Sequence, residues 1–518
     1  MTKRSDCAAL GLVLLGAAVP AGAQQQVLDV ATLARIGTVD ERFQSYNVEM
    51  LEVTGGRFWK PYGSTIDAAA PSSDTPTGMN PNLYEYRPPI DLADPRLRKL
   101  AAALAPAYVR VSGTWANSTY LADSAEPPAA APAGFAGVLS RQQWKGVVDF
   151  ARAVDARLVV SFATSAGTRD AAGVWTPAQA RPFLAYTKEL GGEIAAAEFM
   201  NEPNLASIGG APKGYDAATY GRDFKVFRAF AREAAPSMRI LGPGSVAETM
   251  SPNGIRPTTI VMLQTPDLLA ATGSGVLDVF SYHHYGTVSK RCGGSMTADE
   301  SLSEDWLGRT DATHAFYKPL RDQFEPGKPI WLTETADAAC GGNPWAASFV
   351  DTFRYLDQLG RLAKQGVQVV AHNTLAASDY GMVDGHTLSP RPNYWGAVLW
   401  RKLMGATVLE SGVPLRAGLH AYAHCLRGTR GGVALLLINN DKTAAQTVTL
   451  KAPAEKYTLS SSRPETAQVW LNGTELTWDG KADLPRLQGM PTKAGDVMLA
   501  PATITFLAVP QAGNGVCR

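Results

Sequence analysis

Short apolar runs alternate with stretches of helical periodicity through most of the chain. Runs that suit strands lie at residues 43–53, 107–111, 158–162, 196–200, 239–242, 277–285, 330–334 and 367–371. Between most of them, apolar residues recur at helical spacing, at residues 96–105, 140–154, 176–190, 216–235, 304–324, 349–365 and 394–404. Repeated strand–helix units indicate a parallel sheet, and eight of them predict a closed (β/α)8 TIM barrel in an α/β fold.

The pattern changes on both sides of this region. From about Ala406 helical periodicity vanishes, and short β-rich runs separated by turn residues lie at 420–426, 432–438, 445–450, 467–471 and 503–509. This spacing predicts a β-sandwich. We therefore expect a barrel at residues 41–405 and a sandwich at 406–518, completed by strands from residues 24–40. Residues 61–94, rich in Pro, Ser, Asp and Asn, are expected to form a long loop.

Composition narrows the classes of partner. Of the 518 residues, 45% are apolar and 18% are charged, which is ample material for a sizeable core. Lys and Arg (48) nearly cancel Asp and Glu (47). A nucleic-acid-binding protein normally has a clear basic excess, so this balance argues against one. A polyanionic substrate remains compatible with it, because a local groove of Arg and Lys would suffice.

The first residues and the cysteines indicate export. Residues 1–23 have the form of a signal peptide, with a short basic start, an apolar stretch and small residues before Gln24. We expect a secreted or periplasmic protein without a membrane span after cleavage. Four cysteines then remain, which allow three disulfide pairings. We favour Cys292–Cys340 with Cys425–Cys517, because each pair joins regions expected to be close; four free thiols are the alternative.

Two glutamates follow predicted barrel strands. Glu202 comes just after the fourth strand, where Pro203 prevents continuation in a sheet centre, and Glu334 ends the apolar run of the seventh. The carboxyl ends of barrel strands carry the active site in enzymes of this fold. Glycoside hydrolysis needs two carboxyl groups across one bond, an acid for the leaving oxygen and a nucleophile for the anomeric carbon. We therefore predict that the two glutamates share one active site.

Longer motifs resemble a known family. Asn-Glu-Pro-Asn at residues 201–204, His-His-Tyr at 283–285, and Trp-Leu-Thr-Glu-Thr at 331–335 with Cys-Gly-Gly-Asn-Pro at 340–344 are similar to glycoside hydrolase family 79, the family of heparanase and β-glucuronidases. The resemblance covers about residues 40–510 in the family's order. Asn-Glu-Pro alone is common to many barrel hydrolases, whereas the segment from Glu334 to Pro344, with Tyr380 downstream, is more specific.

The resemblance implies a retaining mechanism, with Glu202 as the acid and base and Glu334 as the nucleophile. It implies no metal and no cofactor. A retaining pair should lie about 5 to 5.5 Å apart. An ionised Glu334 would raise the pKa of Glu202. By position in the family, further side chains and backbone groups would bind the sugar, its carboxylate or the nucleophile: Glu49, Thr114, Asn201, His283, Tyr285, Cys340, Gly341 and Tyr380.

The expected substrate is a glucuronate-containing oligosaccharide or polysaccharide. Cleavage within heparan sulfate and removal of terminal glucuronate both fit the motifs. The lysine-rich heparin-binding segment of the animal enzyme is missing, and Lys290, Arg291 and Arg309 are its nearest substitutes. Two other classes remain open, namely an arabinofuranosidase or xylosidase of the same barrel type, and a carbohydrate-binding protein that has lost catalysis.

Overall fold

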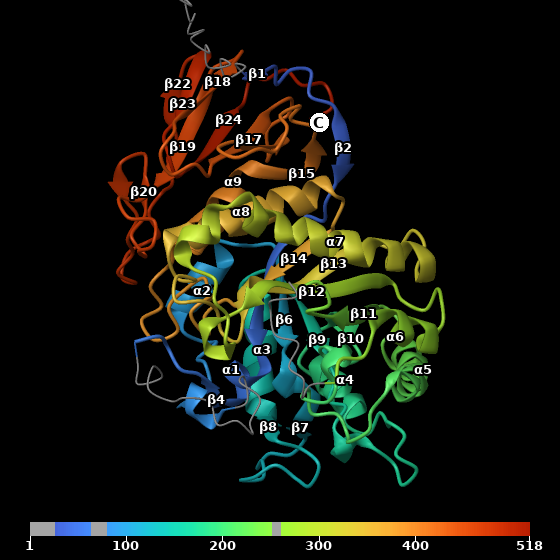
Figure 1. Ribbon diagram of the computed structural model, residues 1–518. Coiled ribbons are helices and arrows are strands. Elements are labelled where there is room, and N and C mark those ends of the chain that lie inside the picture. Colours follow the sequence, from blue (N-terminus) through green and yellow to red (C-terminus); the bar gives the residue numbers. More distant parts are fainter. Residues whose placement is uncertain (1–25, 64–79, 251–260) are drawn as a thin grey trace, which may run out of the picture.

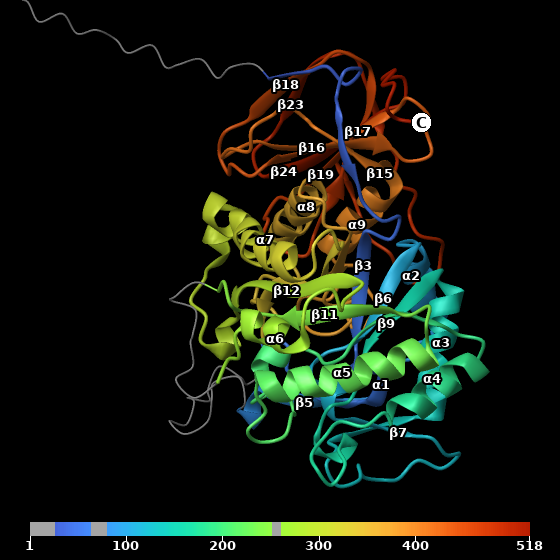
Figure 2. The same ribbon diagram turned by 90° about the vertical axis from the view of Figure 1, so that its right-hand side faces the viewer.

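The computed structural model describes residues 26–63, 80–250 and 261–518. The predicted signal peptide and part of the predicted loop at 61–94 lie outside the described residues. Figure 1 shows a barrel in the lower part of the molecule and β-sheets above it, with helices α8 and α9 between them; Figure 2 gives the same arrangement from the side. Within the described residues, no helix is long and apolar enough to cross a membrane.

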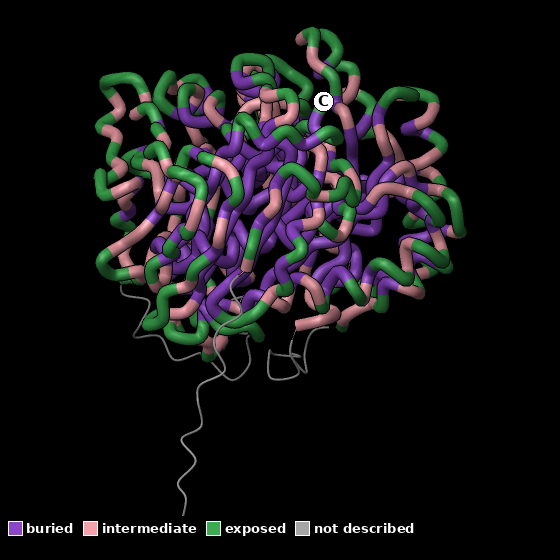
Figure 3. Tube along the Cα trace, turned by 90° about the horizontal axis from the view of Figure 1, so that it is seen from above, coloured by how far each residue is buried: buried purple, intermediate pink, exposed green. Residues whose placement is uncertain are grey.

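The predicted barrel is confirmed. Eight strands close into a ring in which every neighbouring pair is parallel. In chain order they are β3 (Gln44–Glu49), β6 (Ala107–Ser112), β9 (Ala156–Ser161), β10 (Ile194–Glu198), β11 (Arg239–Ser245), β12 (Val279–Val288), β13 (Ile330–Ala339) and β14 (Val369–His372). Buried residues fill the centre, and exposed residues lie mainly around the rim (Figure 3).

The helices between these strands bury apolar faces against the barrel. They are α1 (Met50–Thr54), α2 (Pro95–Ala102), α3 (Arg141–Ala153), α4 (Ala180–Glu189), α5 (Ala217–Ala234), α6 (Thr265–Thr272), α7 (Glu304–Phe324), α8 (Phe349–Lys364) and α9 (Pro392–Leu403). The strand predicted at 43–53 is too long, because the observed strand β3 ends at Glu49 and helix α1 follows. The Glu52 carboxylate accepts the N–H of Glu49 at 2.7 Å, which stabilises the start of that helix.

The prediction of one long loop at 61–94 is wrong in its second half. Strand β5 (Tyr84–Arg87) pairs antiparallel with β4 (Gly56–Trp59). Tyr84 stacks on Trp59 with ring centroids 4.5 Å apart. Aromatic residues suit a hairpin, and the loop-like composition of the preceding residues concealed this one. The hairpin matters because it lies against the predicted active site. A smaller parallel pair, β7 (Thr119–Ala122) with β8 (Gly137–Ser140), follows β6.

The remaining strands form two sheets. The larger joins β2 (Arg35–Thr38), β15 (Met404–Leu409), β16 (His420–Leu426), β17 (Val433–Asn439), β24 (Thr503–Val509), β19 (Ala454–Ser460), β20 (Trp470–Leu471) and β21 (Thr474–Glu475), with β22 (Met490–Thr492) beside β19. The smaller joins β1 (Gln26–Leu28), β18 (Gln446–Leu450) and β23 (Gly495–Leu499).

Strand β17 is buried on both faces. Val433, Leu435 and Leu437 pack between the two sheets. Ala434, Leu436 and Ile438 belong to the core that the larger sheet shares with α8 and α9. One sheet therefore serves two cores, and side-chain alternation explains why β17 is apolar along its length.

Strands β12 and β13 extend beyond the barrel. Pairing of β13 with β14 ends at Thr335, but its pairing with β12 continues to Ala339, opposite Val288. The disulfide Cys292–Cys340 follows directly, and Cys425–Cys517 links β16 to the C-terminus, so both favoured pairings are confirmed. The expectation that Glu334 ends its strand is wrong, because the small residues after it continue the two-stranded ribbon.

Candidate active site

Glu334 owes its direction to a β-bulge. Tyr282 lies opposite Leu332 and His283 opposite Glu334, so Thr333 is an extra residue on β13. Without the bulge, alternation would point Glu334 away from the barrel interior. With it, both side chains point inward: Thr333 Oγ1 donates to Glu198 Oε1 at 2.7 Å, and Glu334 Oε2 accepts from Arg110 at 2.7 Å.

Glu202 lies four residues beyond β10 in a left-handed conformation, with φ 48°. That conformation is uncommon for residues other than glycine. Asn117 holds the preceding residue in place, because its side chain both accepts the N–H of Asn201 and donates to its carbonyl, each at 2.9 Å. Pro203 then begins a short 3-10 helix. These contacts turn the chain sharply and direct Glu202 toward the barrel axis.

The two glutamates face each other. Carboxylate oxygens of Glu202 and Glu334 and a ring nitrogen of His283 all lie within 4.8 Å of one another. This separation suits the direct attack of a retaining glycosidase, since an inverting enzyme needs room for a water molecule. The same spacing could admit a cation. The guanidinium of Arg110 already places a positive charge beside Glu334, however, and each of the three groups has a hydrogen-bond partner.

The pKa values of the two carboxyl groups move in opposite directions. Burial raises the pKa of Glu202, and the neighbouring Glu334 carboxylate adds to this against the hydrogen bond from His283. Burial would also raise the pKa of Glu334, but His283, Arg110 and a hydrogen bond from Tyr285 outweigh it and lower it. The pKa of Glu202 is therefore shifted upward and that of Glu334 downward, which is the order that an acid beside a nucleophile would need.

Arg110 is the centre of the buried network, and sequence reasoning missed it. It is 1% exposed and donates to Glu334, to Asn201 Oδ1 at 2.8 Å and to Glu198 Oε2 at 2.8 Å. Although burial would raise the pKa of Glu198, Arg110 and His283 hold it well below its ordinary value. A signal was available, because Arg110 and Glu198 each interrupt an apolar strand, and buried charges need partners.

His283 and Tyr285 both contact the glutamates. His283 Nδ1 lies 3.1 Å from Glu202 Oε1, and Tyr285 Oη donates to Glu334 Oε1 at 2.7 Å. Burial would lower the pKa of His283, but the surrounding carboxylates raise it to about 9. His284 faces the other way and contacts Thr313 Oγ1 at 2.8 Å. Burial lowers the pKa of His284 to about 3, so this histidine is neutral and structural.

Glu49 and Tyr380 share a hydrogen-bond partner, Asn373, which nothing in the sequence had indicated as a site residue. The Asn373 amide donates to Glu49 Oε1 at 3.1 Å, to Tyr285 Oη at 3.0 Å and to Tyr380 Oη at 3.2 Å. Burial raises the pKa of Glu49 well above its ordinary value, and the charge of Glu334 contributes to this. Glu49 Oε2 is buried and has no partner among the described residues. Thr114 begins a short 3-10 helix after β6 and is half-buried, and no hydrogen bond links its side chain to Glu202 or Glu334.

The turn after β13 requires its glycines. Cys340, Gly341 and Gly342 all have positive φ, at 65°, 79° and 86°. A Cβ on Gly341 would lie 2.6 Å from Ser378 Oγ and 2.7 Å from the Trp59 ring, so only glycine fits. Among the described residues, the N–H groups of Gly341 and Gly342 have no acceptor, whereas the carbonyls of both accept from Arg291.

Arg291, one of the nearest substitutes for the missing heparin-binding lysines, is not available to a polyanion. Its side chain is buried, pairs with Asp379 and lies 3.7 Å from the centroid of the Tyr62 ring. It also donates to the carbonyl of Lys60, so it fastens the β4 region to the turn after β13. Arg309 is likewise engaged, with Asp305 and the carbonyl of Gly286. Lys290 alone of the three is exposed.

Two facing carboxyl groups at the carboxyl ends of a (β/α)8 barrel define this chain as a glycoside hydrolase of the barrel class. Residues 89–360, just over half of the chain, match the model of the glycosyl hydrolase family 79 N-terminal domain. The chain belongs to glycoside hydrolase family 79.

Curated relatives agree with this assignment over longer stretches. Heparanase of Mus musculus is 27% identical over 98% of this chain and 100% of its own length. Heparanase-like protein 1 of Arabidopsis thaliana is 29% identical over 83% of this chain and 86% of its own. Baicalin-beta-D-glucuronidase of Scutellaria baicalensis is 27% identical over 45% of this chain and 46% of its own.

Proposed function

We propose that the chain is a secreted or periplasmic retaining hydrolase of β-glucuronide linkages, with Glu334 as nucleophile and Glu202 as acid and base. The observation that carries the proposal is a pair of carboxyl groups, Glu334 buried and Glu202 half-buried, that lie at retaining distance and whose pKa values move apart. Glu334 would attack the anomeric carbon while Glu202 protonates the leaving oxygen. Glu202 would then take a proton from the water that hydrolyses the glycosyl-enzyme.

Neighbouring groups support these roles. Arg110 and Tyr285 each donate to one oxygen of Glu334, which fixes the carboxylate plane for attack. Arg110 also occupies the amide oxygen of Asn201. The amide nitrogen of Asn201 is therefore directed to donate, as a contact to the sugar 2-hydroxyl requires.

Recognition of the uronate rests on the turn after β13. In this proposal the N–H groups at Cys340 and Gly341 donate to the substrate carboxylate. Tyr380 accepts at its oxygen from Asn373, so its own proton remains available for the carboxylate. Glu49, with an unpartnered oxygen, and Thr114 would contact sugar hydroxyls, and His283 would orient Glu202.

The substrate class we propose is a glucuronate-containing glycan. The relative named heparanase, matched over its full length, supports a heparan-type chain. The glucuronidase name of a shorter match supports the uronate itself. The substrates of an arabinofuranosidase or xylosidase carry no carboxylate, so such an enzyme would not need free N–H donors and a tyrosine hydroxyl to bind one. A non-catalytic binding protein would not need two carboxyl groups of opposed pKa.

Turnover of aryl β-glucuronide, β-glucoside and β-xyloside tests the proposal, with glucuronide expected to be preferred. Tyr380→Phe should lower kcat/KM for the glucuronide by a factor that corresponds to about 1.5 to 3 kcal/mol of transition-state stabilisation, the range of a hydrogen bond to a charged group. The kcat/KM for the glucoside should be nearly unchanged. Tyr285→Phe is the matched control, because it contacts the nucleophile and should slow both sugars alike. Equal effects of Tyr380→Phe on both sugars would refute carboxylate recognition there.

A further inference from the structure

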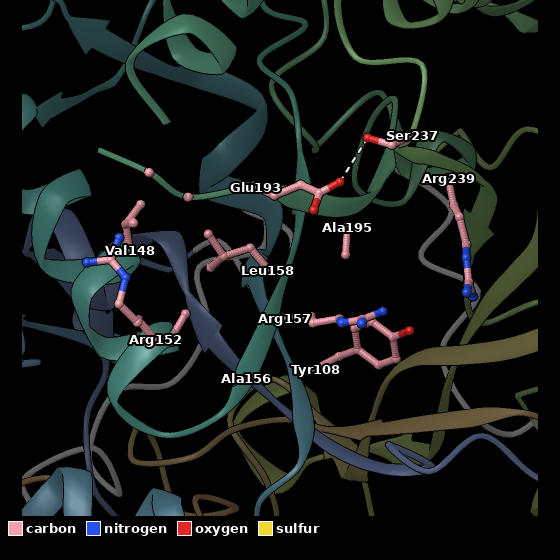
Figure 4. Close-up of a pocket in the computed structure, with 13 residues that line it drawn as sticks. Tyr108, Val148, Arg152, Ala156, Arg157, Leu158, Glu193, Ala195, Ser237 and Arg239 are labelled. Atoms are coloured by element: carbon pink, nitrogen blue, oxygen red, sulfur yellow. Dashed lines mark hydrogen bonds between the residues drawn. The ribbon is translucent and has the colours of Figure 1, made fainter. Parts of the chain in front are cut away.

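A hollow of about 360 Å³ opens at the amino-terminal ends of barrel strands, opposite to the end that carries the glutamates. Residues that begin β6, β9, β10 and β11 line it (Figure 4). A second hollow of about 310 Å³ shares Ser237 and Arg239 with it. This face of a barrel ordinarily contributes stability rather than chemistry, so charged groups gathered there call for an explanation.

Two arginines enter the hollow from strands on either side of β10. Arg157 lies on β9 and Arg239 on β11, each two residues before a residue of the barrel interior, Val159 or Leu241. Side-chain alternation therefore directs both arginines to the inner mouth of the barrel. Between them β10 contributes Ala195, whose small side chain leaves the space open.

Neither arginine is neutralised within the described residues. No ion pair or hydrogen bond of the Arg157 or Arg239 side chain is present there; Arg239 only approaches the Trp331 ring, at 5.6 Å from its centroid. Arg157 is exposed and Arg239 half-buried, so solvent screens their mutual repulsion, and an anion that lies between them would be attracted by both charges.

The other charged groups of the hollow are already engaged. Arg152 donates to the carbonyl of Leu190 at 2.7 Å, as basic residues near helix ends do. In the second hollow, Arg232 forms a bidentate ion pair with Asp278. Glu193 accepts from Ser237 at 2.8 Å, the bond drawn in Figure 4. Glu193 keeps its negative charge, because its partner Ser237 is neutral. Arg157 and Arg239 are the arginines of the hollow that have no hydrogen-bond partner among the described residues, and with them the hollow keeps a net positive charge.

Tyr108 adds a neutral donor. It lines the hollow, and its hydroxyl makes no hydrogen bond with the described residues. Burial raises the pKa of Tyr108, with Asp40 adding to this and Arg239, Arg157 and Arg42 opposing it, so the hydroxyl keeps its proton. Of the other two charges near it, the Arg42 side chain pairs with Asp155, whereas Asp40 accepts the backbone N–H of Arg42 and keeps its negative charge.

We propose that this hollow is an oxyanion site that takes a carboxylate or sulfate group of an acidic glycan, held by Arg157, Arg239 and the Tyr108 hydroxyl. Guanidinium groups bind planar and tetrahedral oxyanions through paired N–H donors, and the volume suits a small ligand group. The choice of a glycan rests on the proposed function. The site would hold a second segment of a long acidic chain away from the catalytic cleft and so retain polymer on the enzyme.

Binding of a fluorescent heparan sulfate octasaccharide tests the site in full-length protein carrying Glu334→Gln, which prevents cleavage. Arg157→Ala with Arg239→Ala should weaken binding at least five-fold. Arg430→Ala with Arg463→Ala, in exposed loops that join strands of the larger sheet, removes the same charge and should change binding less than two-fold. Equal losses in the two pairs would reduce the effect to bulk charge and overturn the proposal, as would no loss in either.

Further measurements distinguish a failure of this site from a failure of the proposed catalytic function. In protein with Glu334 intact, the Arg157 and Arg239 pair should leave aryl glucuronide turnover unchanged but raise KM for the polymer at constant kcat. Arg157→Lys with Arg239→Lys keeps the charge and loses the paired donors, so it should bind nearly as weakly as the alanine pair. A DNA oligonucleotide of equal charge that binds as tightly, with the same loss, would overturn the glycan assignment. Absence of glucuronide turnover in every protein would refute the proposed function alone, because the binding arm is independent of it.

Discussion

At the scale of single residues, the buried guanidinium of Arg110 connects the charged groups of the site. Arg110 contacts Glu334 and Glu198 directly, whereas Glu202 contacts His283 instead. The guanidinium adds to the effect of His283 in lowering the pKa of Glu334, whereas burial and the Glu334 carboxylate raise the pKa of Glu202. Two glutamates of the same intrinsic acidity are separated by their neighbours, as a retaining mechanism requires.

Substitution of each glutamate should reveal its role. Glu334→Gln is expected to abolish turnover of all glucuronides, since no glycosyl-enzyme can form. Glu202→Gln should impair substrates with poor leaving groups far more than activated aryl glucuronides, which need little protonation. Steady-state rates on an alkyl and a nitrophenyl glucuronide provide the comparison. A similar loss on both substrates would place the acid elsewhere.

Much of the site was predictable from single residues. The residues that were not predictable act through partners that only the folded chain brings to them. Glu202, Glu334 and Tyr285 stand in recognisable motifs. Arg110 and Glu198 were visible only as charges within apolar strands, and neither shows from the sequence which partner neutralises it. Asn117 lies in a short 3-10 helix and Asn373 in a loop, and the sequence gives no indication of what either asparagine will contact once the chain folds.

At the scale of elements, alternation predicted the barrel, but local irregularities built the site. A strict period of two on β13 would point Glu334 outward, and one extra residue at Thr333 reverses it. The β12–β13 ribbon continues past the barrel and carries the turn at Cys340. Apolar pattern does not reveal either feature, because a bulge changes register without changing composition and the ribbon is held by cross-strand pairing.

The disulfide at the end of this ribbon should support both stability and specificity. Its cysteines are 48 residues apart, for which chain entropy gives a stabilisation of up to about 4 kcal/mol. Cys292→Ala with Cys340→Gly, a glycine being suited to the positive φ, should lower Tm and weaken the preference for glucuronide over glucoside. Thermal unfolding and the kcat/KM ratio measure the two effects.

The second disulfide supplies the control for that experiment. Cys425→Ala with Cys517→Ala opens a bridge in the sheets that spans 92 residues, so it should also lower Tm. It belongs to the core between the two sheets, away from the turn at Cys340, so its removal should leave the preference for glucuronide over glucoside unchanged. An equal change of preference in both double variants would show that general destabilisation, rather than the ribbon, was responsible.

At the scale of the whole molecule, the larger sheet is joined closely to the barrel helices. A Cβ on Gly360 of α8 would lie 2.4 Å from the Tyr422 ring, so that contact demands glycine. Beside it, His420 of β16 contacts Asp357 Oδ1 of α8 at 2.6 Å and Glu304 Oε1 of α7 at 3.0 Å. The sheet and the barrel thus share a buried ionic contact as well as an apolar core.

This ionic contact should make stability depend on pH in the alkaline range. Burial would lower the pKa of His420, but Asp357 and Glu304 outweigh it and raise the value to about 9 from 6.5. A group with a raised folded pKa stabilises the fold fully below its unfolded pKa, and the contribution is lost as pH rises through the folded pKa. The loss between about pH 6.5 and 9 should amount to about 3 kcal/mol.

His420→Gln isolates the contribution of this contact from that of the catalytic site. Tyr422 and Arg361 also bind Asp357, at 2.5 and 2.6 Å, and Asn440 binds Glu304 at 2.7 Å, so the carboxylates keep partners in the variant. His283 has a pKa raised to about 9 as well, and its effect persists in both proteins. The difference in unfolding free energy between wild type and variant, from urea titrations at pH 6 to 9.5, therefore reports His420 alone. It should be largest near pH 6 and disappear toward pH 9.5; a difference independent of pH would mean that His420 stabilises the junction as a neutral ring.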